Sequence, residues 1–598
     1  MKKQFLLFLG VIAGCFLQAQ WVSDPFINTL LSKGDTTYSY GVFRESPMDS
    51  SYFHLYYNHV DDPSVNYVIY LQKYDFNGLK QWENEGILIS GGPQRTWVPD
   101  MNLAFNHDSC MYVAYSRIVP PTGTTDTLVH IYMNKVTLNG EKLWGNEGID
   151  ISEPADFGDY GPELVVTQQN NIVISYDNSF LDEFFEELDL YKVKVKQYAP
   201  DGSLMWSKVM PRNPANMDWG SRLLELDNHN LMILYKHDTI FEDPDTAALW
   251  YDQCIRSWQF DASGNPVFEQ PKQVFKYPKL FSDVWISPID FRKDKNGGLY
   301  FSANYAQDHV SRTFIQYLDE NSDTLFPHAM SVSTGELANT ERGNYSLAYD
   351  EEMDELVVFW IEKVFDPQNP RNSIMGQKFN MDGQRVWGDE GKLFHPFVSM
   401  FDTIYGWPVV KHTNDDHVLF FFLENILGDE MVNLKAEKYS LDGIMVWPEQ
   451  ILMSGRPDVK AGLCVTNEVN EQFVATWNLD LHDFNISNSI LYGQNIKTNG
   501  HIGTGINDYT NKDISVSIFP NPVGKEQAVN IKLTTQSSSD LSIRLINLQG
   551  QEILTWGNTR LSVGENVVEI PLNHIPNGIY LINIVTAEGL YNGKLIVQ

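Results

Sequence analysis

A segment of about 60 residues recurs along most of the chain, and this repeat constrains the fold more than any other feature. Its clearest part is a polar turn followed four residues later by an aromatic residue, as in Gly78 and Trp82. The turn residues lie 62, 62, 62, 58, 61, 60 and 57 residues apart, at Gly78, Gly140, Gly202, Gly264, Ser322, Gly383, Gly443 and Gly500. Such a period indicates an architecture in which each copy is one supersecondary unit.

Each copy is predicted to form four β-strands. The Asn-Gly and Asp-Gly pairs of the turn favour a type I′ turn between two antiparallel strands. Upstream lies a second hairpin whose second arm is almost wholly apolar, at 111–115, 172–176, 231–235, 356–360 and 418–422. Apolar runs of this length are typical of strands buried on both faces. The repeat therefore predicts an all-β fold, namely an eight-bladed β-propeller.

One aromatic residue occupies the same place in seven copies, at Trp82, Trp144, Trp206, Phe268, Phe326, Trp387 and Trp447. We expect each ring to act as a packing peg between neighbouring sheets. The glycine-to-tryptophan spacing resembles the tryptophan-docking repeats of eight-bladed quinoprotein propellers. That resemblance implies architecture alone, since those enzymes commonly carry a vicinal cysteine pair and no two cysteines are adjacent in this chain.

The N-terminal segment is predicted to close the ring. The eighth copy ends near Gly503 without an outer strand, whereas residues 20–27 match residues 81–88. Trp21 precedes Trp82 by 61 residues, which is the repeat period. We therefore expect this segment to supply the fourth strand of the last blade, because closure removes the exposed sheet edges of an open ring.

The first 19 residues have the pattern of a secretory signal peptide. Lys2 and Lys3 precede an apolar run at 5–16, and cleavage is expected after Ala19. Lipidation at Cys15 is the alternative, because the tetrapeptide that ends there resembles a bacterial lipobox. No later segment is apolar and long enough for a transmembrane helix.

The net charge and the cysteine content bear on the partners and the covalent structure of the protein. Lys and Arg number 43 against 77 Asp and Glu, so the net charge is −34. This charge repels phosphate backbones and argues against nucleic acid as a partner. Cys110, Cys254 and Cys464 are far apart, and we expect buried free thiols. We expect the protein to be a monomer.

A polar linker at 507–512 separates the repeat, at 20–506, from a different pattern at 513–598. The motif residues of this last part are Pro520, Asn521, Pro522, Gly550, Asn577, Gly578, Tyr580 and Lys594. Their blocks resemble the type A C-terminal sorting domain of type IX secretion in Bacteroidetes-like bacteria. Alternating apolar and polar residues at 529–533 and 541–545 predict a small immunoglobulin-like β-sandwich.

The resemblance implies an export route. It implies Sec transport to the periplasm, engagement of the outer-membrane type IX translocon, and removal of the domain by a surface signal protease. The protein is then expected at the outer-membrane surface or outside the cell. An ordinary immunoglobulin-like ligand-binding module is the alternative, because a fold alone does not fix a function.

The loops that lead from each outer strand to the next inner strand gather at one mouth of a propeller. In this chain they carry Trp97, Asp159, Tyr160, Asp218, Trp219, Asp283, Trp285, Tyr345, Asp402 and Trp407. Aromatic rings with carboxylates at a concave mouth suit the capture of a glycan or a peptide. The alternative is that these rings fill the channel or pack the blades together.

No catalytic, phosphate-binding or metal-binding motif occurs in the sequence. His107, His229 and His417 fall in equivalent hairpins of different copies, which argues against a metal site. We therefore expect a cell-surface or secreted non-catalytic binding protein for a glycan, peptide or protein, without a cofactor. An extracellular, glycosidase-like hydrolase that uses the mouth carboxylates is the alternative.

Overall fold

The computed structural model describes residues 21–598 except 32–40, 61–64, 66, 84, 95–99, 120–127, 154–157, 181–189, 211–215, 243–248, 277–289, 308–309, 327, 336–338, 352, 428–430, 481–489, 504–515, 525–526, 536–537, 548–551, 573–574 and 587–588. The expected signal peptide, Cys15 and the linker at 507–512 lie outside the described residues. The chain divides into two compact units, residues 1–502 and 503–598.

The described secondary structure of the first unit consists of β-strands alone. Its first half contains β1 (Thr29–Leu30), β2 (Gly41–Glu45), β3 (Tyr52–His59), β4 (Tyr67–Tyr74), β5 (Ile87–Ser90), β6 (Met101–Phe105), β7 (Cys110–Val119), β8 (Leu128–Thr137), β9 (Ile149–Asp150), β10 (Gly158–Val166), β11 (Ile172–Phe180), β12 (Leu190–Tyr198), β13 (Leu204–Val209), β14 (Asn216–Glu225), β15 (Leu231–Glu242) and β16 (Leu249–Phe260). Its second half contains β17 (Lys272–Lys276), β18 (Asp290–Lys293), β19 (Leu299–Gln307), β20 (Val310–Leu318), β21 (Met330–Ser331), β22 (Thr340–Asp350), β23 (Glu355–Val364), β24 (Arg371–Phe379), β25 (Lys392–Ser399), β26 (Thr403–His412), β27 (His417–Ile426), β28 (Met431–Ser440), β29 (Ile451–Ser454), β30 (Val459–Val465), β31 (Gln472–Asp480) and β32 (Ile490–Lys497).

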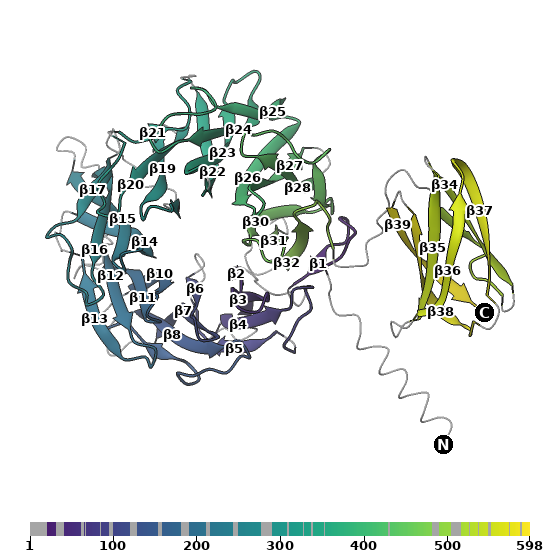
Figure 1. The fold of residues 1–598 in the computed structure, drawn as a ribbon. Helices are drawn as coiled ribbons and strands as arrows, with labels where there is room; N and C mark the ends of the chain where they lie inside the picture. Colours follow the sequence, from purple (N-terminus) through teal and green to yellow (C-terminus); the bar gives the residue numbers. More distant parts are fainter. Residues whose placement is uncertain are drawn as a thin grey trace. The chain divides into compact units, whose positions relative to one another are not determined.

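Strand pairing arranges these described strands as groups of four, antiparallel and mostly in chain order, such as β2-β3-β4-β5 and β14-β15-β16-β17. Single parallel pairs, Gly158 with Val129 and Arg312 with Arg342, join two neighbouring groups each. The groups surround a ring, with the first strand of a group toward the centre, as seen for β6, β10, β14 and β26 (Figure 1). The expected all-β propeller fold is confirmed.

The cores lie between neighbouring groups. The second strands carry the apolar runs that the sequence singled out, and their side chains at 111–115 and 418–422 are almost wholly buried, as predicted. One cluster combines Phe53 and Leu55 of β3 with Met111 and Val113 of β7. Sheets that share their apolar faces in this way hold the inner strands in a fixed order around the ring.

The N-terminal segment completes the last group, as predicted. β1 pairs with β32, with Thr29 opposite Gly493. Asn28 Nδ2 donates to the Met453 carbonyl at 2.9 Å and to Gln494 Oε1 at 3.1 Å. Trp21 is 1% exposed and donates from its backbone N–H to the Asn77 carbonyl at 2.9 Å. The segment therefore joins the last group and also reaches the first.

Most of the aromatic pegs, and Trp21, pack against the turn glycine of the following group. A Cβ added to Gly78 would meet the ring of Trp21 at 2.7 Å, and one added to Gly264 would meet Trp206 at 2.6 Å. The same contact joins Gly140 to Trp82, Gly202 to Trp144, Gly383 to Phe326 and Gly500 to Trp447. A turn glycine of the next group therefore lies against each of Trp21, Trp82, Trp144, Trp206, Phe326 and Trp447.

The expected type I′ geometry of these turns is wrong. Type I′ requires a positive φ at both central residues, but Asn77 keeps a negative φ and Gly78 alone has a positive one, 85°. The Gly78 N–H donates to the Asp75 carbonyl at 3.0 Å, and the Asp75 N–H donates to the Leu79 carbonyl at 2.9 Å. The loop is a three-residue connection that ends in a left-handed glycine.

The second unit contains two sheets, β33-β34-β37 and β36-β35-β38-β39. Its strands are β33 (Val516–Phe519), β34 (Ala528–Thr535), β35 (Ser539–Asn547), β36 (Glu552–Leu561), β37 (Gly564–Pro571), β38 (Gly578–Thr586) and β39 (Gly589–Val597). Residues of both sheets, among them Ile531 and Ile582, form one buried core. This is the arrangement expected of a sandwich, while its immunoglobulin-like character stays a prediction.

Two further expectations concern thiols and membrane helices. Cys110, Cys254 and Cys464 are free thiols, the first two buried and the third half-buried. The search of the described residues for a helix able to span a membrane found none.

Candidate functional site

The residues predicted to form a mouth lie at the N-terminal ends of inner strands. Trp97, Asp283 and Trp285 fall outside the described residues. The others occupy comparable points of four groups: Asp159 and Tyr160 on β10, Asp218 and Trp219 on β14, Tyr345 on β22, and Asp402 and Trp407 just before and on β26. Their role in binding stays a prediction.

A β-bulge interrupts five inner strands at these points. The pairing register shifts after Tyr160, Trp219, Gly343, Gly406 and Ala461. Each bulge contains one residue with a positive φ, namely Gly161 at 62°, Gly220 at 62°, Asn344 at 47°, Trp407 at 50° and Gly462 at 64°. Bulges re-aim side chains and are frequent beside functional sites.

Trp407 is the exception among these bulge residues. A bulky residue enters the left-handed region only at a cost of about 1–3 kcal/mol, which glycine avoids. Its side chain is also 51% exposed, although tryptophan is usually well buried. The chain therefore holds a large aromatic ring toward solvent at a point where three other groups have glycine.

The mouth carboxylates on β10 and β14 are engaged within the protein. Asp218 is 3% exposed, with Oδ1 at 2.6 Å from His237 Nδ1 and Oδ2 accepting from Lys192 Nζ at 3.2 Å. Asp159 is buried and accepts a hydrogen bond from Asn178 Nδ2 at 2.6 Å. Both carboxylates therefore act as internal hydrogen-bond partners, whereas Asp402 is exposed.

The indole of Trp219 is held in a buried polar cluster. Its Nε1 donates to Asp238 Oδ2 at 2.7 Å, and Lys236 Nζ lies 4.3 Å from the ring centroid. Burial raises the pKa of Asp238 to about 6. Burial, with the Arg222 guanidinium nearby, lowers the pKa of Lys236 to about 7. These contacts favour packing as the role of Trp219.

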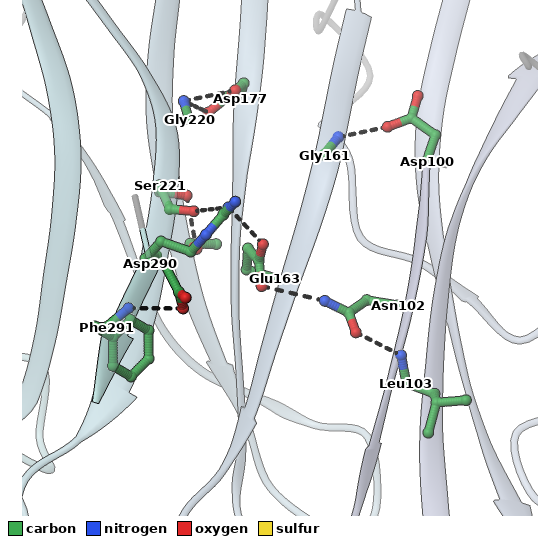
Figure 2. A network of polar contacts seen from close by, with 12 residues as sticks. Asp100, Asn102, Leu103, Gly161, Glu163, Asp177, Gly220, Ser221, Asp290 and Phe291 are labelled. Carbon is green, nitrogen blue, oxygen red and sulfur yellow. Dashed lines mark hydrogen bonds and ion pairs between the residues drawn. The ribbon is translucent and has the colours of Figure 1, made fainter. Parts of the chain in front are cut away.

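Hydrogen bonds connect the bulge glycines to aspartates of the preceding group (Figure 2). The Gly161 N–H donates to Asp100 Oδ1 at 2.6 Å. The Gly220 N–H donates to both carboxylate oxygens of Asp177, at 2.9 and 3.1 Å. Burial nevertheless raises the pKa of Asp177 to about 7, because these bonds offset only part of the lost hydration.

A polar belt crosses β6, β10 and β14 next to the bulges (Figure 2). Asn102 Nδ2 donates to Glu163 Oε2 at 3.2 Å, and Arg222 Nη1 donates to Glu163 Oε1 at 2.7 Å. Burial raises the pKa of Glu163, while Arg222 opposes that shift. Sequence reasoning missed this belt, since its members lie about 60 residues apart and belong to no motif.

The opposite ends of the inner strands enclose a cavity of about 580 Å³, within the usual range for a small-molecule site. Its walls come from the ends of β2, β18, β22, β26 and β30 and from the turns that follow. The charged and titratable residues in these walls are Arg44, Glu45, Arg292, Lys293, Tyr349, Glu351, Lys411, His412 and Glu468. No sequence pattern pointed to these residues, because only the closed ring brings them together.

The described residues contain no cluster of three or more His, Cys, Asp or Glu side chains arranged to hold a metal ion. His107 and His229 lie exposed in the hairpin turns before β7 and β15, and His417 begins β27. The three histidines therefore belong to three different groups of strands.

The motif residues of the second unit stabilise its own fold, although Gly550 lies outside the described residues. Asn521, between Pro520 and Pro522, donates from Nδ2 to the Lys594 carbonyl at 2.6 Å and accepts from the Ile596 N–H at 2.9 Å. The Tyr580 hydroxyl donates to the Pro576 carbonyl at 2.7 Å. Asn577 and Gly578 lie at the start of β38.

Comparison with known families assigns this second unit. Residues 517–598 match the family described as secretion system C-terminal sorting domain, and the C-terminal part of the chain belongs to it. The expected type IX sorting domain is thereby confirmed. No curated protein matched the chain.

Several solved structures are similar to the propeller at low identity. The polysaccharide lyase Uly1 is 9% identical, with 80% of this chain and 97% of that chain covered and a TM-score of 0.39. The Dos1 propeller is 11% identical, with 78% and 95% covered and a TM-score of 0.39. An α-L-arabinanase of Penicillium chrysogenum is 9% identical, with 56% and 92% covered and a TM-score of 0.28.

Proposed function

We propose that this protein is an exported, non-catalytic binding protein whose propeller captures a glycan, a peptide or another protein. The type IX translocon and its surface signal protease are the partners that place it at the cell surface or outside the cell. The sorting domain at 517–598 supports the export part of this proposal. Trp407 supports the binding part.

Trp407 differs from the residues at equivalent bulges of other groups. The chain places glycine at the bulges of Gly161, Gly220 and Gly462, where a positive φ is required. At Trp407 it places a 51% exposed indole instead, although strain and exposure both disfavour it. An aromatic face held toward solvent by a paired strand is a good platform for a sugar ring or an apolar side chain.

The state of the carboxylates favours binding over hydrolysis. A glycosidase needs two carboxyl groups about 5–10 Å apart on either side of the scissile bond. Asp159 and Asp218 are buried, and each accepts hydrogen bonds from protein groups, Asp159 through Oδ1. Neither presents an open oxygen to a sugar at the surface. The hydrolase stays the alternative, with Asp402 as its exposed carboxylate.

The substitution Trp407→Gly tests the binding site directly. It removes the indole and installs the residue that other groups use at this bulge. We expect binding to the best glycan or peptide of an immobilised panel to weaken at least tenfold, about 1.4 kcal/mol. The free energy of unfolding is expected to stay level or to rise by about 1 kcal/mol, because the strained φ is relieved.

Leu204→Ala is the matched control, since Leu204 is also exposed but lies on the outer strand β13. Its binding should equal that of the wild type. A Trp407→Gly protein that binds the panel normally contradicts the proposed site. Turnover of a chromogenic glycoside, abolished by Asp402→Asn, contradicts the non-catalytic assignment and favours the hydrolase.

A further inference from the structure

The cavity of about 580 Å³ at the far ends of the inner strands gathers cations in a strongly acidic protein. Although the net charge is −34, Arg44, Arg292 and Lys411 come together there from three strands of different groups. These strands are β2, β18 and β26, which occupy separate parts of the ring. A cationic cavity in an anionic molecule concentrates the electrostatic attraction for an anion at one point.

Two of these cations, Arg44 and Lys411, form no ion pair with a carboxylate of the described residues. Arg44 is exposed, and its one hydrogen bond is a long contact from Nη1 to the Phe43 carbonyl at 3.3 Å. Lys411 Nζ donates to the neutral amide Oδ1 of Asn467 at 3.1 Å. Burial and the Arg292 guanidinium lower the pKa of Lys411, and the Glu45 carboxylate offsets only part of that shift, so the positive charge of Lys411 is incompletely compensated.

Arg292 is held in a fixed position in the same cavity. Its Nε donates to the Leu347 carbonyl at 3.0 Å, and its Nη1 donates to Asp290 Oδ1 at 2.7 Å. These bonds orient the guanidinium and leave Nη2 without a hydrogen bond to a described residue. A guanidinium fixed on one edge, with donors left on the other, suits a planar carboxylate or a sulfate.

Two of the three carboxylates in the cavity walls, Glu45 and Glu468, are held by uncharged donors. Glu45 Oε1 accepts from Asn467 Nδ2 at 2.7 Å, and Glu468 Oε2 accepts from the Asn414 N–H at 2.8 Å. Asn467 thereby bridges Glu45 and Lys411. The oxygens of these carboxylates suit hydroxyl donors, while their charge disfavours a ligand with several negative groups nearby.

We propose that this cavity binds an acidic saccharide, whose carboxylate or sulfate lies among Arg44, Arg292 and Lys411 and whose hydroxyl groups donate to Glu45 and Glu468. The site is distinct from the Trp407 bulge and does not depend on the function proposed for it. A ligand with one anionic group and several hydroxyl groups satisfies both the cations and the carboxylates of the cavity walls. The volume accommodates one or two sugar rings.

Isothermal titration of the mature full-length chain with digalacturonate tests the proposal, with neutral galactobiose as the comparison. We expect binding of digalacturonate alone, weakening as salt increases. Lys411→Met and Arg44→Gln should each weaken it at least tenfold. Lys411→Met keeps an aliphatic side chain of similar length and removes one of several like charges, so we expect the protein to fold normally. An unchanged melting temperature of the variant would confirm this.

Lys272→Met is the charge control. Lys272 lies on the outer strand β17 and pairs with Asp323, and its loss changes the net charge by the same amount as the loss of Lys411. Binding should be unchanged in this variant and in Trp407→Gly. Equal affinity for galactobiose, or full affinity in both cavity variants, overturns the proposal. Inorganic sulfate or a hexaglutamate peptide that binds as tightly as digalacturonate overturns the saccharide assignment.

Discussion

At the scale of single residues, this protein buries several charged side chains whose protonation is set by their surroundings. Asp177 accepts both hydrogen bonds from the Gly220 N–H, and Lys236 packs on Trp219 a short distance away. Burial raises the pKa of Asp177 to about 7 and lowers that of Lys236 to about 7. Both groups thus favour their neutral forms in the folded state.

These shifts predict a pH dependence of stability. The folded protein keeps the Asp177 proton up to about pH 7, whereas the unfolded chain loses it near pH 4, so stability should fall as pH rises between those values. Lys236 acts in the opposite direction above pH 7, because the unfolded chain then binds the extra proton. Urea unfolding at several pH values measures the free energy of unfolding below and above pH 7.

Asp177→Asn and Lys236→Met separate the two pH ranges. Asparagine still accepts from the Gly220 N–H through Oδ1 but does not titrate. The Asp177→Asn variant should therefore show a smaller fall in stability below pH 7, the remainder coming from Asp238, and should keep the dependence above pH 7. The Lys236→Met variant should show a smaller rise above pH 7 and keep the dependence below it. Identical pH profiles for wild type and both variants contradict the assignment.

Part of the candidate site could be predicted from the sequence, and part of it could not. Exposed aromatic residues at repeat positions were visible in it, and Trp407 was among them. The burial of Asp159 and Asp218 was not, because a carboxylate that binds a ligand and one that accepts from a neighbouring lysine look alike in sequence. The cavity cations left no pattern either, since their proximity depends on ring closure rather than on spacing.

At the scale of the strand and turn, the repeat unit was largely predictable and one detail was not. The buried second strands and the pegs followed from apolar runs and spacing. The predicted turn type was wrong, because an Asn-Gly pair is compatible with more than one kind of hairpin loop. The side chain of Asp75 accepts from the Asn77 and Leu79 N–H groups at 2.9 Å each, which favours the longer loop.

The peg contact predicts unequal effects of two similar substitutions. Gly264 and Gly388 both have positive φ, 79° and 86°, so alanine strains the backbone at either site. A Cβ at Gly264 would also meet the Trp206 ring at 2.6 Å, whereas one at Gly388 would meet nothing within 4 Å. We expect Gly388→Ala to lower the free energy of unfolding by about 1–2 kcal/mol.

Gly264→Ala should cost about 1–3 kcal/mol more, because the peg must move or the sheets must separate. Chemical denaturation of the two variants gives the difference. Equal losses would mean that the pegs adjust freely and do not fix the distance between groups.

At the scale of the whole molecule, one short N-terminal segment joins the ends of the ring. Trp21 is 1% exposed, and its indole Nε1 donates to the Phe76 carbonyl at 2.9 Å. We expect Trp21→Ala to cost about 3–5 kcal/mol of unfolding free energy through the cavity that it leaves. Phe26→Ala, at a side chain 57% exposed, should change it by less than about 0.5 kcal/mol.

The division into two units predicts separable folding and export. Deletion of residues 513–598 removes the sorting domain but none of the strands β1–β32. The truncated protein should therefore fold, with a β-sheet circular dichroism spectrum and a cooperative unfolding transition, and accumulate in the periplasm of its host. Its appearance at the cell surface in normal amounts would contradict the sorting role.

The pairing of β1 with β32 also sets an order of events in time. Asn28 and Gln494 meet across 466 residues, so bringing these ends together from a flexible chain costs about 5 kcal/mol of loop-closure entropy. Neighbouring groups, in contrast, dock after closing loops of about 60 residues. The seam therefore forms last during folding, and its amide hydrogens at Thr29 and Leu30 should exchange with solvent before those of any other paired strand in the ring.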